Sequence, residues 1–149
     1  ERRVLATVKR LVIAYAGAQS TRALAAKLTV RNRATVQGVD MSSQIEEACL
    51  QACNECAAAC LQCATACLQE ADPKPMTRCI ALDLECADMC QLAAASIARG
   101  GEHMKAICAL CAEICRSCAT ECGTHDMGHC KRCAEACKRC ADACLTMVR

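Results

Sequence analysis

Cysteine, rather than leucine, occupies the regularly spaced apolar positions over most of this chain. In CLQACNECAAACLQCATAC (49–67), cysteine recurs at intervals of four and three residues, which is the spacing of one face of an α-helix. The same pattern returns three more times, with Ala beside the cysteines and charged residues farther from them. We therefore predict four amphipathic helices whose buried faces are lined by thiols.

Breaks in the pattern predict where these helices end. The first break is ADPKP (71–75), in which two prolines stop a helix, the second is Gly100–Gly101, and the third is Gly123. Asp83 occupies a stripe position in the second helix, where a buried carboxylate needs a partner. All 19 cysteines fall on the four stripes: Cys49, Cys53, Cys56, Cys60, Cys63, Cys67, Cys79, Cys86, Cys90, Cys108, Cys111, Cys115, Cys118, Cys122, Cys130, Cys133, Cys137, Cys140 and Cys144.

Helices of about 20 residues joined by short connections favour an antiparallel up-down-up-down four-helix bundle. The predicted fold is therefore all-α with a Cys-lined core. Residues 1–40 do not share the pattern, and they carry eight basic and two acidic residues, a net charge of +6, whereas residues 41–149 carry −4. We predict a basic N-terminal extension over residues 1–40 and a Cys-rich four-helix bundle over residues 41–149.

The extension has several interpretations. Apolar residues at helical spacing over residues 4–15 are compatible with a short basic amphipathic helix. Lys9 and Arg10 and the short apolar run exclude a membrane span, and the same run is a weak match to an export signal. KLTV (27–30) resembles the Leu-Thr-Val-type peptides that load cargo into encapsulin shells. A docking segment and a functionally neutral extension both stay open.

The composition requires something other than side-chain volume to stabilise the core. The chain has no Phe or Trp and one Tyr, so small Ala and Cys side chains must fill the interior, and they bury little apolar area. Disulfides explain this poorly, since the cysteine count is odd. Neighbouring stripe positions have Cβ atoms about 5–6 Å apart, whereas a disulfide prefers about 3.8 Å. Pairing between helices stays open.

Convergent thiols on four helices indicate metal binding. Zinc favours closed sites with four ligands, and iron–sulfur clusters favour four cysteines in loops. A regular stripe instead supplies pairs of sulfurs along an axis, which suits soft Cu(I) with two or three thiolate ligands. Monovalent ions that replace thiol protons also leave the core near neutrality. We predict storage of multiple Cu(I) ions per chain; an iron–sulfur electron-transfer protein and a zinc or cadmium buffer are the alternatives.

No catalytic triad, phosphate-binding loop or carboxylate pair is recognisable in the sequence. We therefore expect no enzymatic activity, no catalytic residues, no nucleic-acid partner and no membrane span.

The cysteine motifs resemble those of a known family. CLQCATAC, CIALDLECADMCQLAAASIA, CAEICRSCATEC and HCKRCAEACKRCADAC are similar to the cytosolic branch of the bacterial copper storage proteins, over about residues 41–147. The resemblance implies Cu(I) bound by CxxxC-type pairs, a homotetramer, a cytoplasmic location and an ion entrance lined by His and Met at one end of the bundle. The matching candidates for that entrance are His103, Met104, His125 and His129. Met76, Met127 and Met147 lie near predicted helix ends, where their thioether sulfurs could transfer Cu(I), although ordinary packing explains them at least as well.

Overall fold

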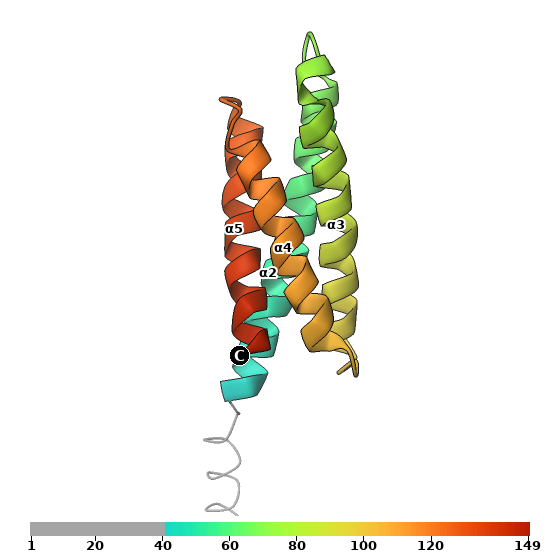
Figure 1. The fold of residues 1–149 in the computed structure, drawn as a ribbon, viewed down its shortest axis with the longest axis vertical. Coiled ribbons are helices and arrows are strands. Elements are labelled where there is room, and N and C mark those ends of the chain that lie inside the picture. The colour runs from blue at the N-terminus through green and yellow to red at the C-terminus, as the bar shows by residue number, and fades with distance from the viewer. Residues whose placement is uncertain (1–40) are drawn as a thin grey trace, which may run out of the picture. The chain divides into compact units, whose positions relative to one another are not determined.

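Four α-helices make up the part of the chain that the structure, a computed structural model, describes: residues 41–149 (Figure 1). They are α2 (Met41–Leu68), α3 (Thr77–Ala98), α4 (Met104–Cys122) and α5 (Gly128–Val148), with a short 3₁₀ turn, η1 (Lys74–Met76), before α3. No strand occurs within residues 41–149, so the predicted all-α class is confirmed. The interpretations placed on residues 1–40 lie outside the described range.

The predicted breaks separate the helices, and α3 shows the clearest termination. Gly100 has φ +61°, a left-handed conformation that residues with a Cβ rarely adopt. The amide of Gly101 donates to the carbonyl of Ser96 at 2.9 Å, and that of Gly100 donates to the carbonyl of Ile97 at 3.0 Å. This pair of hydrogen bonds is a Schellman motif, which satisfies the last carbonyls of the helix. Gly123 directly follows α4, as its position in the sequence predicts.

Successive helices run in opposite directions (Figure 1). The connection between α2 and α3 and the connection between α4 and α5 lie at one end of the bundle, which we call the upper end. The lower end holds the start of α2, the connection between α3 and α4, and the end of α5. Sulfur contacts agree with this arrangement, because Cys49 meets Cys144 while Cys63 meets Cys130. The up-down-up-down topology is confirmed.

The core consists almost entirely of cysteine and alanine. All 19 cysteines are buried, and alanines next to the stripes, such as Ala57, Ala87 and Ala112, are buried beside them. Small flanking side chains allow the helix backbones to approach closely, and alanine also has the highest helix propensity. The lower half of α3 differs, since Ala93 and Ile97 take the inward positions there. None of the helices in residues 41–149 combines the length and apolar character needed to span a membrane.

Candidate metal-binding column

The 19 buried cysteines form one continuous assembly along the bundle axis, which we call the thiol column. Sulfur atoms from different helices lie in contact: Sγ of Cys79 on α3 is 3.4 Å from Sγ of Cys122 on α4, and Sγ of Cys60 on α2 is 3.5 Å from Sγ of Cys137 on α5. All 19 are free thiols. The prediction that the four stripes converge on a shared interior is confirmed, and the alternative of disulfides between helices is not observed.

Sets of four sulfur atoms lie close enough to share a metal ion at successive levels of the column. Within each set, all sulfur atoms lie within 4.8 Å of one another. The sets include Cys53, Cys111, Cys140 and Cys144; Cys56, Cys60, Cys86 and Cys137; Cys56, Cys90, Cys115 and Cys140; Cys60, Cys118, Cys133 and Cys137; and Cys63, Cys67, Cys79 and Cys130. Several sets share members, such as Cys56, Cys60 and Cys137. Neighbouring ions in such sites would therefore share thiolate ligands.

Burial raises the pKa of three thiols that lie toward the ends of the column. Removal from water raises the pKa of Cys108 to about 12 and that of Cys130 to about 11, and it raises the pKa of Cys79 as well. A metal ion that binds these sulfurs must displace their protons, because the thiolate is the ligand. In the metal-free protein these three thiols are therefore neutral S–H groups.

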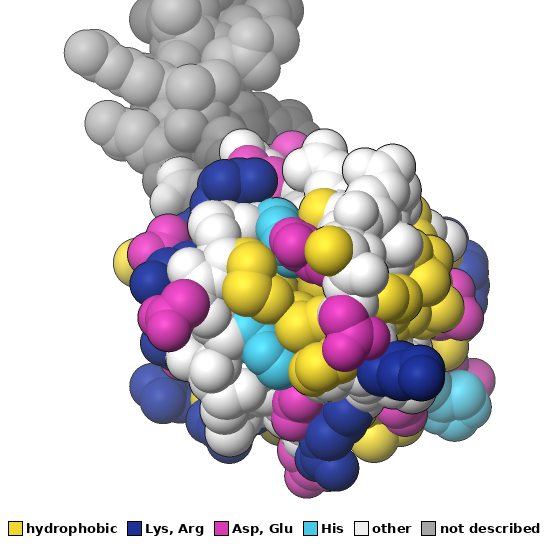
Figure 2. Space-filling model, turned by 90° about the horizontal axis from the view of Figure 1, so that it is seen from above, with side chains coloured by type: hydrophobic (Ala, Val, Ile, Leu, Met, Phe, Trp, Pro, Cys, Tyr) yellow, Lys and Arg dark blue, Asp and Glu magenta, His cyan; other side chains and the backbone are white. Residues whose placement is uncertain are grey.

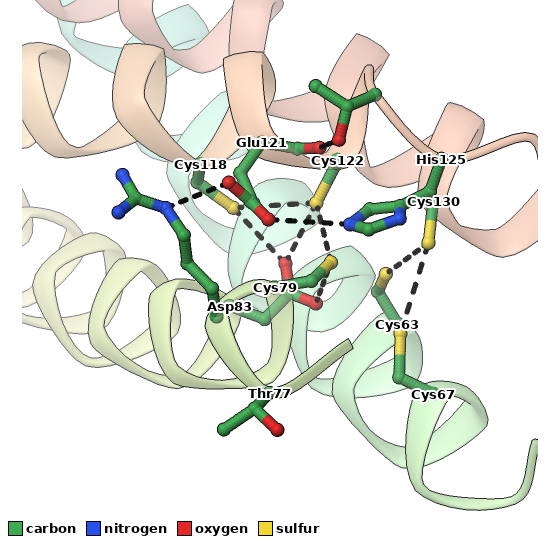
Figure 3. A network of polar contacts seen from close by, with 12 residues as sticks. Cys63, Cys67, Thr77, Cys79, Asp83, Cys118, Glu121, Cys122, His125 and Cys130 are labelled. Carbon is green, nitrogen blue, oxygen red and sulfur yellow. Dashed lines mark hydrogen bonds and ion pairs between the residues drawn. The ribbon is translucent and has the colours of Figure 1, made fainter. Parts of the chain in front are cut away.

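Asp83 is a carboxylate inside this column, and it is fully buried. Its Oδ1 atom accepts from the thiols of Cys118 at 3.1 Å, Cys133 at 3.2 Å and Cys122 at 3.3 Å, and Figure 3 shows it facing thiols of α4. Burial raises its pKa to about 6. The partner that a buried carboxylate requires is therefore a group of thiols on α4 and α5.

Two of the predicted histidines lie at the upper end. Nε2 of His129 is 3.5 Å from Sγ of Cys67, so this imidazole reaches the uppermost thiols directly. Nε2 of His125 lies 3.4 Å from Glu121, whose carboxylate also pairs with Arg78 at 2.8 Å (Figure 3). Seen from above, this end presents histidine side chains beside hydrophobic ones (Figure 2). Both histidines are therefore placed where an ion could approach the column.

The other two candidates lie elsewhere, which corrects the expectation of one shared end. His103 and Met104 stand at the start of α4, at the lower end, whereas His125 follows the end of α4. The 19 residues of α4 separate the two pairs by about 28 Å at 1.5 Å per residue. His103 is exposed, while Met104 is partly buried against the core. The motif resemblance ignored the helix direction, which alone places the pairs at opposite ends.

The structure also shows where two of the undecided methionines lie. Met76 is buried at the upper end, and Met147 is buried at the lower end, where it lines a pocket together with Met104. Helical spacing was the available signal, since Met147 follows Cys144 by one turn. The spacing alone does not show that these methionines pack against the thiols, and this became clear only from the structure.

Comparisons with known proteins agree with this geometry. A family model described as copper storage protein matches residues 42–149. The cysteine-rich protein YhjQ of Bacillus subtilis is 50% identical over 80 residues, which is 54% of this chain and 74% of that protein.

Two solved structures show the same likeness. The Cu(I)-bound copper storage protein BsCsp3 is 48% identical with a TM-score of 0.68, covering 70% of this chain and 99% of that chain. A cytosolic copper storage protein from Streptomyces lividans, with five coppers, is 36% identical with a TM-score of 0.70, covering 72% of this chain and 94% of that chain. The chain therefore belongs to the copper storage protein family.

Proposed function

We propose that this chain stores Cu(I) as a row of thiolate-bridged ions in the thiol column, with no enzymatic activity. The observation that carries the proposal is the overlap of the four-sulfur sets, in which Cys56, Cys60 and Cys137 each belong to more than one set. Closed zinc sites need four ligands of their own, so overlapping sets suit them poorly. Cu(I) favours soft thiolates and is satisfied by few of them.

Charge balance supports the same ion. A column of neutral thiols exchanges one proton for one monovalent ion at no change in net charge, whereas uncompensated charge in an apolar interior is very costly. Divalent ions at the same loading would accumulate positive charge. With full bridging, the capacity approaches about one ion per cysteine, and it falls to about half of that without bridging.

The ligand geometry argues against the iron–sulfur alternative. Every cysteine of the four-sulfur sets belongs to one of the four helices, whereas clusters are typically wrapped by cysteines on loops. The relatives described as Cu(I)-bound and as holding five coppers add support for copper. Many equivalent sites, rather than one open site with a positioned base, favour storage over catalysis.

We further propose that ions reach the column at the upper end through His125 and His129. Support comes from the 3.5 Å contact between His129 and Cys67, which is short enough for an imidazole to hand an ion to the first thiolate. His103 is left out of this entrance, because it is exposed at the other end of the bundle.

A cytoplasmic location and a homotetramer complete the proposal. Free thiols persist in reducing compartments, and the relative from Streptomyces lividans is described as cytosolic. Exposed leucines on α2, α3 and α4 supply apolar surface for contact between copies: Leu61, Leu68, Leu84, Leu92 and Leu110. Light scattering at micromolar concentration is expected to give four times the monomer mass, and a monomer would contradict it.

For residues 1–40 we propose docking to an encapsulin shell through KLTV (27–30). The test is co-assembly of the full chain with shell protein, compared with a chain in which Leu28, Thr29 and Val30 are replaced by Ser. Equal encapsulation of both would contradict the docking role.

Storage is tested by anaerobic titration of the reduced chain with Cu(I) against a competing chelator. We expect uptake of many ions per chain, loss of thiol reactivity in parallel, and a colourless product. Saturation at one or two ions would end the storage proposal, and visible charge-transfer bands with iron in the purified protein would favour the iron–sulfur alternative.

A further inference from the structure

The lower end of the bundle carries a pocket of about 260 Å³ that is lined by two thioethers, Met104 and Met147. We infer that these two side chains form a second mouth for Cu(I), opposite the histidine entrance. The inference rests on the proposed storage function and adds a site at the other end of the same column. Ile45 of α2 completes the apolar lining.

Both methionines continue a cysteine stripe. Met104 precedes Cys108 by four residues on α4, and Met147 follows Cys144 by three residues on α5. Side chains at these spacings lie next to each other on one helix face. Each thioether is therefore the next soft ligand beyond the last thiol of its own helix, and the two helices bring them to the same pocket.

A path of sulfur contacts leads inward from this mouth. Cys49, Cys108 and Cys144 are fully buried at the lower end. Sγ of Cys144 lies 3.7 Å from Sγ of Cys49 and 3.8 Å from Sγ of Cys53. Cys53 and Cys144 both belong to the lowest four-sulfur set named above. From this end of the bundle, the sulfur contacts of Cys144 with Cys49 and Cys53 therefore lead into the column.

The burial of the two methionines suits a ligand more than a surface contact. Met147 is 6% exposed and belongs to the core, and Met104 is partly buried against it. Met89, by contrast, lies along α3, partly buried against the core, and does not line this pocket. It therefore serves as a matched control for the loss of a thioether.

Thioether chemistry distinguishes the two mouths. A thioether is a neutral, soft ligand that favours Cu(I) over harder ions, and it has no proton to lose on binding. An imidazole titrates and accepts a wider range of metals. Binding by Met104 and Met147 would be weaker than binding by thiolates, because no charge is neutralised, which suits the passage of an ion rather than its retention.

The direct test is NMR of the full-length, reduced chain with ¹³C-labelled methionine methyl groups, assigned from Met→Leu variants. The thiols, which bind Cu(I) more tightly, are first filled without oxygen, and a slight excess of Cu(I) is then added from a chelator complex. The methyl resonances of Met104 and Met147 are expected to shift together, while that of Met89 stays in place. If neither moves while the same sample takes up copper, the inference is overturned, although storage itself stands.

The rate of Cu(I) loading shows whether the two methionines admit ions or only pack at the end of the bundle. The background is a chain carrying His125→Ala and His129→Ala, in which loading through the upper entrance is weakened. This chain is compared with one that also carries Met104→Leu and Met147→Leu. Leucine preserves the volume of methionine at small cost in stability. We expect loading to slow several-fold with unchanged final capacity, and Met89→Leu to have no effect. Equal rates with and without the two thioethers would overturn the mouth, whereas failure of every chain to load would overturn storage instead.

Discussion

Oδ1 of Asp83 lies 3.1 Å from Sγ of Cys118, and this contact joins a carboxylate of α3 to a thiol of α4 in the interior of the bundle. Cys133 of α5 meets the same oxygen at 3.2 Å. One buried acid therefore connects three helices through S–H donors. The metal-free bundle has few large side chains to hold it together, so these polar contacts contribute to which helices meet and at what level.

The buried carboxylate makes the stability of the metal-free chain depend on pH. Burial raises the pKa of Asp83 from its ordinary value of 3.8 to about 6. Between these values the folded state holds a proton that the unfolded state has lost, so the free energy of unfolding falls as pH rises. We expect the titration of Asp83 to lower the free energy of unfolding by about 2 kcal/mol between pH 4 and pH 7, measured by urea unfolding under reducing conditions.

Two variants isolate that contribution. Asp83→Asn removes the titration and is expected to flatten the pH dependence by that amount, while Asp88→Asn, an exposed acid on the same helix, leaves it unchanged. If the free energy of unfolding changed equally with pH in the wild type and in Asp83→Asn, Asp83 would not be the source of the pH dependence.

Copper is expected to stabilise the fold. A core of cysteine and alanine buries little apolar area, and a ligand that binds only the folded state raises its stability by mass action. The thermal midpoint, followed by circular dichroism without oxygen, should rise step by step with the amount of Cu(I) added. Addition of the same copper with excess chelator is the control. A midpoint that is unchanged on loading would contradict binding within the core.

The histidine nearest the column is expected to matter for the rate of loading. His129→Ala removes the imidazole that lies 3.5 Å from Cys67, so the early phase of Cu(I) uptake should slow in stopped-flow absorbance. His103→Ala is the comparison, because its side chain is exposed at the opposite end. Equal early rates for both variants would argue against an entrance at the upper end.

The turn after α3 allows a test of the fold that does not involve metal. A Cβ at Gly101 would lie 2.6 Å from Oγ of Ser96 and 3.3 Å from its carbonyl oxygen. Gly101→Ala is therefore expected to destabilise the chain by about 1–3 kcal/mol, and Ser96→Ala in the same chain should restore part of it. Gly128→Ala is the control, since its nearest neighbour is the flexible side chain of Arg132, 3.4 Å away. No difference between the two alanine variants in urea unfolding would contradict the crowding.

Local sequence patterns were enough to predict most of the fold. The period of the cysteines gave the helices and their buried faces, and Gly100 marked a helix end because its left-handed backbone disfavours other residues. The spacing of the cysteines does not show which residues of different helices contact each other. Cys79 lies four residues from Asp83 on the same helix, but the other thiol partners of Asp83 come from α4 and α5, 35 to 50 residues away, and no local spacing predicts contacts over that range.

The site was predicted less completely than the fold. The cysteine ligands follow from their stripes, but the overlap of four-sulfur sets depends on the register between helices. The four candidates for the entrance were grouped by motif, although a helix of 19 residues separates His103 from His125. Antiparallel connections put the start and the end of α4 at opposite ends, and that is a property of topology rather than of composition.

The number of Cu(I) ions that one chain holds tests the central claim most directly. Native mass spectrometry of the reduced chain, loaded without oxygen and freed of loosely bound metal, counts them. Storage in a thiolate-bridged column predicts a series of species extending from about half the number of cysteines to about one ion per cysteine, with free thiols lost in step. A single species with one or two ions, or full thiol reactivity in the loaded protein, would contradict it.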